Sequence, residues 1–308
     1  MRVFVAGATG AVGRQLVPRL VSAGHEVHGM TRSESKKTML EDMGAIPVVA
    51  DALDPEGVAE AVATAQPEVV VHELTAIEGV DPRRFDDDFA GTNRLRTEGT
   101  DHLLSAAQAV GVRRFVAQSH VLPYAGSGSR VKAEDDPLGP APARRMRRTV
   151  AAIHHLEEAV LGARWAEGIV LRYGHFYGPG TWMAPDAELA DMIRKRKFPL
   201  VGKGSGVWSF VHVGDAADAT VAAVERGGRG VYNVADDDPA PVSEWLPALA
   251  QELEAPEPVH VPRWVGRLFA GGAGVVMMNE FRGASNAKVK HELGWQPAHP
   301  TWRDRFAA

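Results

Sequence analysis

The feature that most constrains this chain is a glycine-spaced segment, Gly7-Ala8-Thr9-Gly10-Ala11-Val12-Gly13, which lies between a short apolar run and an amphipathic one. The preceding residues 3–5 predict a buried strand, and the apolar spacing that follows predicts a helix that ends near Gly24. In such a unit the first glycine permits a tight turn, the second lets the backbone approach a ligand, and the third lets the helix pack on the strand. The N–H groups at the start of the helix then face an anion. The spacing therefore predicts that a pyrophosphate is held by Gly7, Thr9, Gly10, Ala11, Val12 and Gly13.

Six further apolar runs have the length and composition of strands, and helical patterns separate most of them. The predicted strands cover residues 26–30, 46–50, 69–71, 115–117, 169–172 and 231–234, and the predicted helices include residues 33–43, 55–65, 85–110 and 143–162. Continuous apolar strands that alternate with helices are typical of a parallel sheet covered on both faces. With right-handed crossovers, they predict an α/β fold with a doubly wound parallel sheet of the Rossmann type.

The composition of the chain shifts near residue 178. Six of the seven tryptophans and more than half of the 20 prolines lie beyond this point. This shift predicts a smaller, loop-rich C-terminal lobe that binds the substrate between aromatic walls. Because the last predicted strand interrupts this part of the chain, we expect the two lobes to interleave. The dinucleotide-binding domain would cover residues 1–177 and 207–236, and the substrate lobe residues 178–206 and 237–308.

The composition also excludes several classes of protein. The chain has no cysteine, so a disulfide framework, a zinc finger and a thiol nucleophile are excluded. The net charge of -5 argues against a nucleic-acid partner, and no apolar run is long enough to span a membrane. The chain begins directly with a strand, which favours the cytoplasm. No pair of histidines has the spacing of a helical metal site, so no metal is predicted, and the expected partner is a small molecule.

The end of the second predicted strand bears on the choice of dinucleotide. NAD-binding proteins usually have an acidic residue here, whereas this chain has Thr31 and Arg32, with Lys36 and Lys37 close behind. An arginine at this position can pair with a 2′-phosphate and stack on adenine, so the predicted cofactor is NADP. Asp51 either contacts the adenine amino group or caps the following helix. The same cofactor site is predicted to include Ala52, Leu74, Thr75 and Ser119.

Together with segments further along the chain, these residues resemble the extended short-chain dehydrogenase/reductases, which include the NAD-dependent epimerases and dehydratases of nucleotide sugars. The resemblance rests on residues 7–13, Asp51, the segments 103–115, 171–172, 177–180 and 207–213 with Asp215, and residues 293–297. It implies the same fold and nucleotide binding over nearly the whole chain. It also implies that the helices at 85–110 and 143–162 pair between subunits, which gives a homodimer.

The chain departs from this family where the family carries its catalytic Tyr-x-x-x-Lys pair. None of the four tyrosines has a lysine four residues later, and none lies between residues 125 and 172. Alignment on Glu157 places Thr149 and Ile153 at the positions of the pair, and neither residue can move a proton near neutral pH. The position of the family's catalytic serine or threonine holds His120. The register of the family's asparagine holds Arg96, and Asn93 lies about one turn earlier.

Three other side chains are therefore candidates for the acid/base role. His120 and Tyr124 follow the fifth strand, and His175 follows the sixth, where ligands bind in such folds. Histidine titrates near neutral pH and could pass a proton. The predicted function is an NADP(H)-dependent oxidoreductase that moves a hydride to or from a carbonyl or carbinol carbon. A nucleotide-sugar epimerase or dehydratase and a non-catalytic NADP-binding regulator are the alternatives.

Two charged clusters need an explanation. The arginines within residues 144–148 open the helix at 143–162, where cations oppose the helix dipole. We expect the acidic residues 134–136 to compensate this charge, although one arginine could instead reach an anionic substrate or the cofactor phosphates. The three aspartates at 86–88 are interpreted as a solvated helix start.

Overall fold

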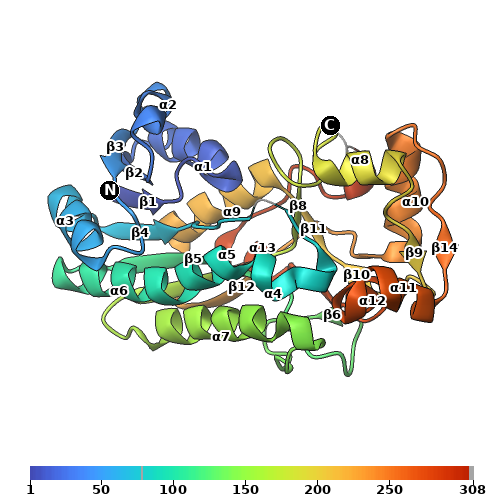
Figure 1. Cartoon of the computed structure of the whole chain (residues 1–308). Coiled ribbons are helices and arrows are strands. Elements are labelled where there is room, and N and C mark those ends of the chain that lie inside the picture. The colour runs from blue at the N-terminus through green and yellow to red at the C-terminus, as the bar shows by residue number, and fades with distance from the viewer. Residues whose placement is uncertain (78, 305–308) are drawn as a thin grey trace.

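The computed structural model describes residues 1–77 and 79–304, and its centre is a seven-stranded parallel sheet (Figure 1). The strand order is β12-β7-β5-β4-β1-β2-β3. The strands are β1 (Arg2–Ala6), β2 (Glu26–Thr31), β3 (Ile46–Val49), β4 (Val69–His72), β5 (Arg114–His120), β7 (Glu167–Tyr173) and β12 (Gly230–Val234). From β1 the chain adds β2 and β3 on one side of the sheet, and it then returns to add β4 and the later strands on the other side of β1. Sheets of this kind bind ligands at such a reversal, in the crevice at the carboxyl ends of the two strands, here β1 and β4. The predicted α/β fold is confirmed.

Helices cover both faces of the sheet and bury the side chains of its central strands on both sides, whereas the edge strand β3 is partly exposed. One face packs against α1 (Ala11–Ser22), α2 (Lys37–Asp42), α9 (Val213–Arg226) and α13 (Ala287–Leu293). The other face packs against α3 (Pro55–Ala65), α6 (Thr100–Ala109) and α7 (Arg147–Gly162). Helices α1 and α9 pack against each other, and at the surface Arg19 and Asp218 form an ion pair of 2.8 Å between them.

The segment predicted as one helix over residues 85–110 is interrupted. It consists of α4 (Phe85–Asp88), α5 (Ala90–Arg94), a π-helical turn over Leu95–Gly99 and α6. At this turn, side chains bond a backbone carbonyl of the helix. The Leu95 carbonyl accepts from the Thr100 hydroxyl at 3.5 Å and lies 3.3 Å from His72 Nε2. Such bonds cause local widening of a helix. The turn changes the side-chain register at Arg96.

Most of the C-terminal third forms a second apolar cluster at one end of the sheet (Figure 1). Its helices are α8 (Glu188–Arg194), α10 (Val242–Glu252), α11 (Arg263–Phe269) and α12 (Gly271–Asn279). Short strand pairs join these helices: β6 (Val131–Lys132) with β15 (Gly283–Ala284), β8 (His175–Tyr177) with β11 (Phe210–His212), β9 (Leu200–Val201) with β14 (His260–Val261), and β10 (Val207–Trp208) with β13 (Ala240–Pro241). Trp208, Trp245 and Trp302 are buried in this cluster.

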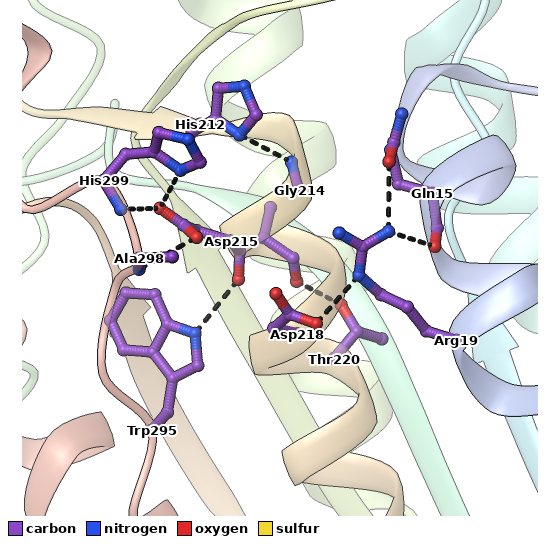
Figure 2. Close-up of polar contacts among 11 residues, drawn as sticks. Gln15, Arg19, His212, Gly214, Asp215, Asp218, Thr220, Trp295, Ala298 and His299 are labelled. Atoms are coloured by element: carbon purple, nitrogen blue, oxygen red, sulfur yellow. Dashed lines mark hydrogen bonds and ion pairs between the residues drawn. The ribbon is translucent and has the colours of Figure 1, made fainter. Parts of the chain in front are cut away.

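Asp215, in the first turn of α9, ties the end of the chain to the sheet (Figure 2). Its carboxylate accepts the N–H groups of Ala298 and His299 at 3.0 and 2.9 Å, and its carbonyl accepts the Trp295 indole at 3.0 Å. The Asp215 side chain is 2% exposed. Trp295 therefore packs against the sheet rather than in the C-terminal cluster, which departs from the expectation that this tryptophan belongs to the substrate lobe.

Candidate functional site

The glycine turn has the geometry that its spacing predicts. Gly7 has a φ of 95°, and a Cβ atom there would lie 2.5 Å from the Glu73 carbonyl at the end of β4. A Cβ on Gly13 would lie 2.3 Å from the Gly7 carbonyl, so α1 rests directly on the turn. The first backbone bond of the helix runs from the Arg14 N–H to the Gly10 carbonyl at 3.0 Å. The N–H groups of residues 11–13 thus have no acceptor within the helix and are available to an anion.

The turn opens toward solvent where a ligand would approach. Gly10 is exposed, Thr9 and Ala11 are partly exposed, and Val12 and Gly13 are buried beneath them. The N-cap position, Gly10, carries no side chain, so no capping bond competes for the free N–H groups. This arrangement fits a pyrophosphate group. The assignment of these residues to cofactor binding remains a proposal.

The residues after β2 and β3 lie on the same edge of the sheet. Thr31 ends β2 and is buried, whereas Arg32 is exposed and pairs with no described residue. Asp51 accepts the Leu53 N–H at 3.0 Å, so it stabilises the turn before α3 and does not itself cap the helix. Ala52 is buried, and its carbonyl accepts from His102 Nδ1 at 2.9 Å. Among these residues, Arg32 has an exposed guanidinium that is available to bind a negatively charged ligand.

The predicted cofactor residues after β4 and β5 have different environments. Leu74 is partly buried, its N–H donates to His72 Nδ1 at 3.2 Å, and Thr75 is exposed. Ser119 lies in β5, is 1% exposed, and donates its hydroxyl to Glu157 Oε1 at 2.6 Å. The Ser119 hydroxyl is therefore occupied within the protein.

His120 and His175 meet at the carboxyl edge of the sheet. Their rings form an edge contact with centroids 5.0 Å apart, and His175 stacks on Trp208 at 4.0 Å. Burial lowers the pKa of His120 well below its usual value, helped by His175 and Arg96, and burial lowers the pKa of His175 to about 4. Burial therefore favours the neutral forms of both histidines, and their acid/base role stays a prediction. His120 Nδ1 accepts the Leu122 N–H at 3.0 Å, which leaves the ring proton on Nε2.

Tyr124 has a structural environment rather than that of an acid. Its hydroxyl donates to Asn233 Oδ1 at 2.7 Å and accepts from Arg172 at 3.0 Å. Burial raises the pKa of Tyr124, so the hydroxyl keeps its proton. Arg172 also forms a buried bidentate pair with Glu157, at 2.8 and 2.6 Å. This network joins β5, α7, β7 and β12.

Thr149, near the start of α7, is also engaged. Its hydroxyl donates to Asp86 Oδ1 at 2.9 Å and accepts from Asn93 Nδ2 at 3.1 Å. Asp86 is 5% exposed and also accepts the N–H groups of Arg148 and Thr149, so the interpretation of residues 86–88 as a solvated helix start is wrong for Asp86. Ile153, one turn further along α7, is buried.

The charge at the start of α7 is compensated by Asp86 and Asp87. Arg148 pairs with Asp87, and Arg145 lies 3.6 Å from the same carboxylate. The expected compensation by residues 134–136 is not found: Glu134 accepts the Asn233 N–H at 2.7 Å, and Asp136 pairs with Lys132 at 3.2 Å. Aspartates on the neighbouring helix were not expected because they lie 58 or more residues away in sequence.

A cavity of about 440 Å³ opens beside this edge of the sheet. Its walls include Val121, Tyr124 and His175 from the sheet side and Phe281 from the C-terminal cluster. The cavity is therefore lined by both parts of the molecule, and its walls are partly aromatic. It is the space that a substrate could occupy next to His175.

Two buried charged side chains lie near the site: Glu73, which the sequence analysis did not single out, and Arg96, which it placed only at the register of the family's asparagine. Glu73, directly after β4, is 4% exposed, and burial raises its pKa to about 8; one of its oxygens bonds Tyr173 at 3.0 Å and the other has no partner among the described residues. Arg96 is 5% exposed, and its Nη1 has no partner there either. A sequence signal was present for Glu73, which closely follows the apolar residues 69–71. Arg96 gave no such signal, because its neighbours are mostly polar.

A possible metal-ligand group also lay outside the sequence prediction. His212, Asp215 and His299 offer ligand atoms within 4.8 Å of one another (Figure 2). Hydrogen bonds already use these atoms, because Asp215 accepts from His299 Nδ1 at 3.1 Å and His212 Nδ1 accepts the Gly214 N–H at 3.2 Å. These bonds explain the cluster without a metal, and the prediction of no metal site stays a prediction.

Comparison with known proteins decides the family. The family model described as "NAD dependent epimerase/dehydratase family" matches residues 3–235. The chain belongs to this family. A 3-diazoavenalumate denitrifying reductase from a Streptomyces species is 46% identical over 99% of this chain and 98% of the relative. A farnesyl-dihydroquinoline-oxide ketoreductase from Stigmatella aurantiaca is 29% identical over 82% of this chain and 73% of the relative.

Solved structures of the family share the fold. UDP-glucose 4-epimerase from Thermotoga maritima, solved with UDP-glucose, has a TM-score of 0.74 at 21% identity over 97% of this chain and 94% of the epimerase. The Thermus thermophilus UDP-glucose 4-epimerase, solved with NAD, has a TM-score of 0.70 at 24% identity over the same shares of the two chains.

The family and the relatives make the chain an NAD(P)-dependent oxidoreductase of the extended short-chain dehydrogenase/reductase type. Its membership and enzymatic nature are as predicted. Within the part of the chain that the structure describes, no helix is both long and apolar enough to cross a bilayer.

Proposed function

We propose that this enzyme is an NADPH-dependent reductase that delivers a hydride to an aromatic diazo acid and releases dinitrogen. The glycine turn would hold the pyrophosphate through the free N–H groups of residues 11–13, and Arg32 would bind a 2′-phosphate. The substrate would occupy the cavity beside His175. Residues 1–177 with 207–236 would serve the cofactor, and the rest of the chain the substrate.

The observation that carries this proposal is that none of the predicted acid/base residues, nor Thr149 at the family's tyrosine position, is set to supply a proton near neutral pH. Glu73, whose pKa burial raises to about 8, bonds Tyr173 and does not line the cavity. The Tyr124 and Thr149 hydroxyls both donate to partners within the protein. His120 and His175 are held in their neutral forms by burial, and neutral imidazole is a very weak acid. Reduction of a ketone, or removal of a sugar proton, needs such an acid or base. A reaction that needs neither fits this site better.

Loss of a diazo group meets this requirement. A reduced nicotinamide, if held by the glycine turn, would supply a hydride to the aromatic carbon. A C–H bond would form there while the C–N bond breaks, and dinitrogen would leave with the electron pair of that bond. No proton enters or leaves the balance, and the cofactor ends oxidised. The 46%-identical relative is named as a denitrifying reductase of a diazo compound. An epimerase or dehydratase activity is disfavoured because both depend on acid/base catalysis.

In this reaction the residues of the chain position the substrate and exclude water. The ring stack of His175 on Trp208, at 4.0 Å, forms a flat wall against which an aromatic ring can lie. The His120 Nε2–H can donate a hydrogen bond without releasing its proton. His120, His175 and Tyr124 are thus proposed to line the site rather than to act as acids.

Isotope labelling tests the proposal. The purified enzyme is incubated with diazotised 3-aminocinnamate and NADPH that carries deuterium at the transferable position, with an enzyme-free control. We expect the ring carbon that lost nitrogen to carry deuterium, one dinitrogen to be released per NADPH oxidised, and no deuterium to enter from D2O with unlabelled cofactor. A product that retains nitrogen, or turnover of ketones but not of the diazo acid, would contradict the proposal.

A further inference from the structure

Arg96 is a buried guanidinium without a counter-ion. It lies in the π-helical turn Leu95–Gly99, is 5% exposed, and forms no hydrogen bond or ion pair with any described residue. The other buried arginine among these residues, Arg172, is fully engaged by Glu157 and Tyr124. An unpaired charge taken out of water is strongly unfavourable. A partner for Arg96 is therefore missing.

The surroundings of Arg96 supply no free negative charge. The carboxylate that acts on it is Glu157, which already accepts two bonds from Arg172 and one from Ser119. His72 and His120, the other titratable groups near Arg96, are neutral near neutral pH because burial lowers the pKa of each. Burial lowers the pKa of Arg96 only to about 10, so the guanidinium stays charged. The group carries a net positive charge that a ligand must neutralise.

Arg96 does not itself line the cavity of the protein without ligands, but it lies near the pair of histidines beside it. It is close enough to His120 for its charge to act on that ring, and His120 contacts His175, which lines the cavity. Asn93, three residues earlier, has a buried Oδ1 that also lacks a partner among the described residues. Two buried, unpartnered polar atoms so close in sequence indicate that a polar ligand binds beside them.

The single charge indicates the kind of anion. One guanidinium neutralises one negative charge and matches the planar, two-oxygen geometry of a carboxylate. A phosphate would call for a second cation, and neither His72 nor His120 provides one. The aromatic walls at His175 and Phe281 favour a flat ring attached to that carboxylate.

We propose that Arg96 binds the carboxylate of an aromatic acid substrate and sets the preference of the enzyme for acids over their neutral amides. This inference rests on the proposed function only for the position of the substrate. It assigns Arg96 a binding role that the family's asparagine, implied at this register, could not have, because an amide carries no charge.

The test uses binding rather than turnover, so that it does not depend on the diazo reaction. Cinnamate and cinnamamide are titrated calorimetrically into the complex of the enzyme with NADP⁺. We expect the wild type to bind cinnamate more tightly than the amide. In Arg96→Gln the affinity for cinnamate falls by about 10- to 100-fold, while the affinities for cinnamamide and NADP⁺ stay unchanged. Arg96→Lys retains part of the preference.

Arg94→Gln is the matched control, because Arg94 lies on the same helix but is exposed and paired with Glu98. It should behave as the wild type. Equal binding of acid and amide by the wild type, or a loss of NADP⁺ affinity in Arg96→Gln, would overturn the proposal. If cinnamate binding depends on Arg96 but no diazo acid is reduced, the proposed reaction fails and the carboxylate site stands.

Stability gives a second, independent test. If Arg96 had a structural partner, Arg96→Met would lower the melting temperature of the protein without ligands. If its partner is a ligand, removal of an unpaired buried charge leaves that temperature unchanged or raises it. A marked decrease in Arg96→Met would therefore contradict the proposal.

Discussion

At the scale of single residues, Arg32 is the side chain on which the proposed choice of NADP over NAD depends. It is exposed, and no described residue competes for its charge. Charge-assisted bonds to a phosphate contribute more than neutral ones. We expect Arg32→Ala to weaken NADPH binding by about 10- to 100-fold and to leave NADH binding nearly unchanged, as measured by fluorescence titration. The neighbouring, exposed Lys36→Ala should have a smaller effect, and an Arg32→Ala protein that still prefers NADPH would refute the assignment.

Residue identities predicted the geometry of the glycine turn better than the environments of the side chains beside it. The glycine spacing is local, so its geometry follows from a few consecutive residues. The state of Tyr124 depends on Asn233, 109 residues away, and on Arg172, 48 residues away. The pKa of His175 depends on burial under Trp208 and on its neighbours, which only the folded chain brings together. The bonds of Asp86 to the start of α7 could not be predicted either, because Asp86 and Thr149 lie 63 residues apart in sequence.

At the scale of elements, Gly13 and Gly10 lie in the connection from β1 to α1, and substitutions at these two positions should have different effects on stability. A methyl group on Gly13 would lie 2.3 Å from the Gly7 carbonyl, so Gly13→Ala should force the helix away and cost about 1–3 kcal/mol of unfolding free energy. A methyl group on Gly10 meets only the Gly7 carbonyl, at 3.3 Å, so Gly10→Ala should cost about 1 kcal/mol or less.

The Gly10→Ala substitution should affect NADPH binding more than it affects stability. The added methyl of Gly10→Ala stands at the exposed N-cap where the pyrophosphate would approach, so this variant should fold but lose NADPH binding. Denaturant unfolding and fluorescence titration measure the two effects. A stable Gly10→Ala protein with wild-type affinity for NADPH would show that the turn does not hold the pyrophosphate.

The apolar runs predicted every strand of the sheet, and the central strands β1 and β4 have the continuous apolar sequence that burial on both faces requires. The broken helix at 85–110 could not be predicted in the same way. Its π-helical turn depends on a bond from the Thr100 hydroxyl to the Leu95 carbonyl and on His72 from β4, and neither contact leaves a periodic signal. Arg96 lies in this turn, so its burial could not be predicted from the periodicity of the sequence.

At the scale of the whole molecule, the homodimer through residues 85–110, which include α6, and residues 143–162, which include α7, stays a prediction. Large exposed apolar side chains do not lie on these two helices; those that are most exposed lie on α11, where Trp264, Leu268 and Phe269 are 69–71% exposed. A dimer through α6 and α7 would thus have to be held largely by polar contacts such as those available to His155 and Asp101.

The stability of the whole molecule should depend on pH through Glu73. Burial raises the pKa of Glu73 to about 8, and the group bonds Tyr173 at 3.0 Å. The folded chain therefore holds a proton that the unfolded chain releases above about pH 4.5. The stability from this group is fully present below about pH 4.5 and is lost as the pH rises through about 8. Each such proton lowers the unfolding free energy by at most about 1.4 kcal/mol per pH unit in this window.

Glu73→Gln keeps the size and polarity of the side chain but cannot ionise, so its unfolding free energy should fall less steeply than that of the wild type between pH 5 and pH 8. Asp236 has a pKa raised to about 8 for the same reason, so it should leave a remaining slope that Asp236→Asn removes. Denaturant unfolding at several pH values, with and without both substitutions, separates the two groups. Identical slopes for the wild type and Glu73→Gln would mean that the Glu73 carboxyl ionises in the folded protein as readily as in the unfolded chain, and its burial would then not control its proton.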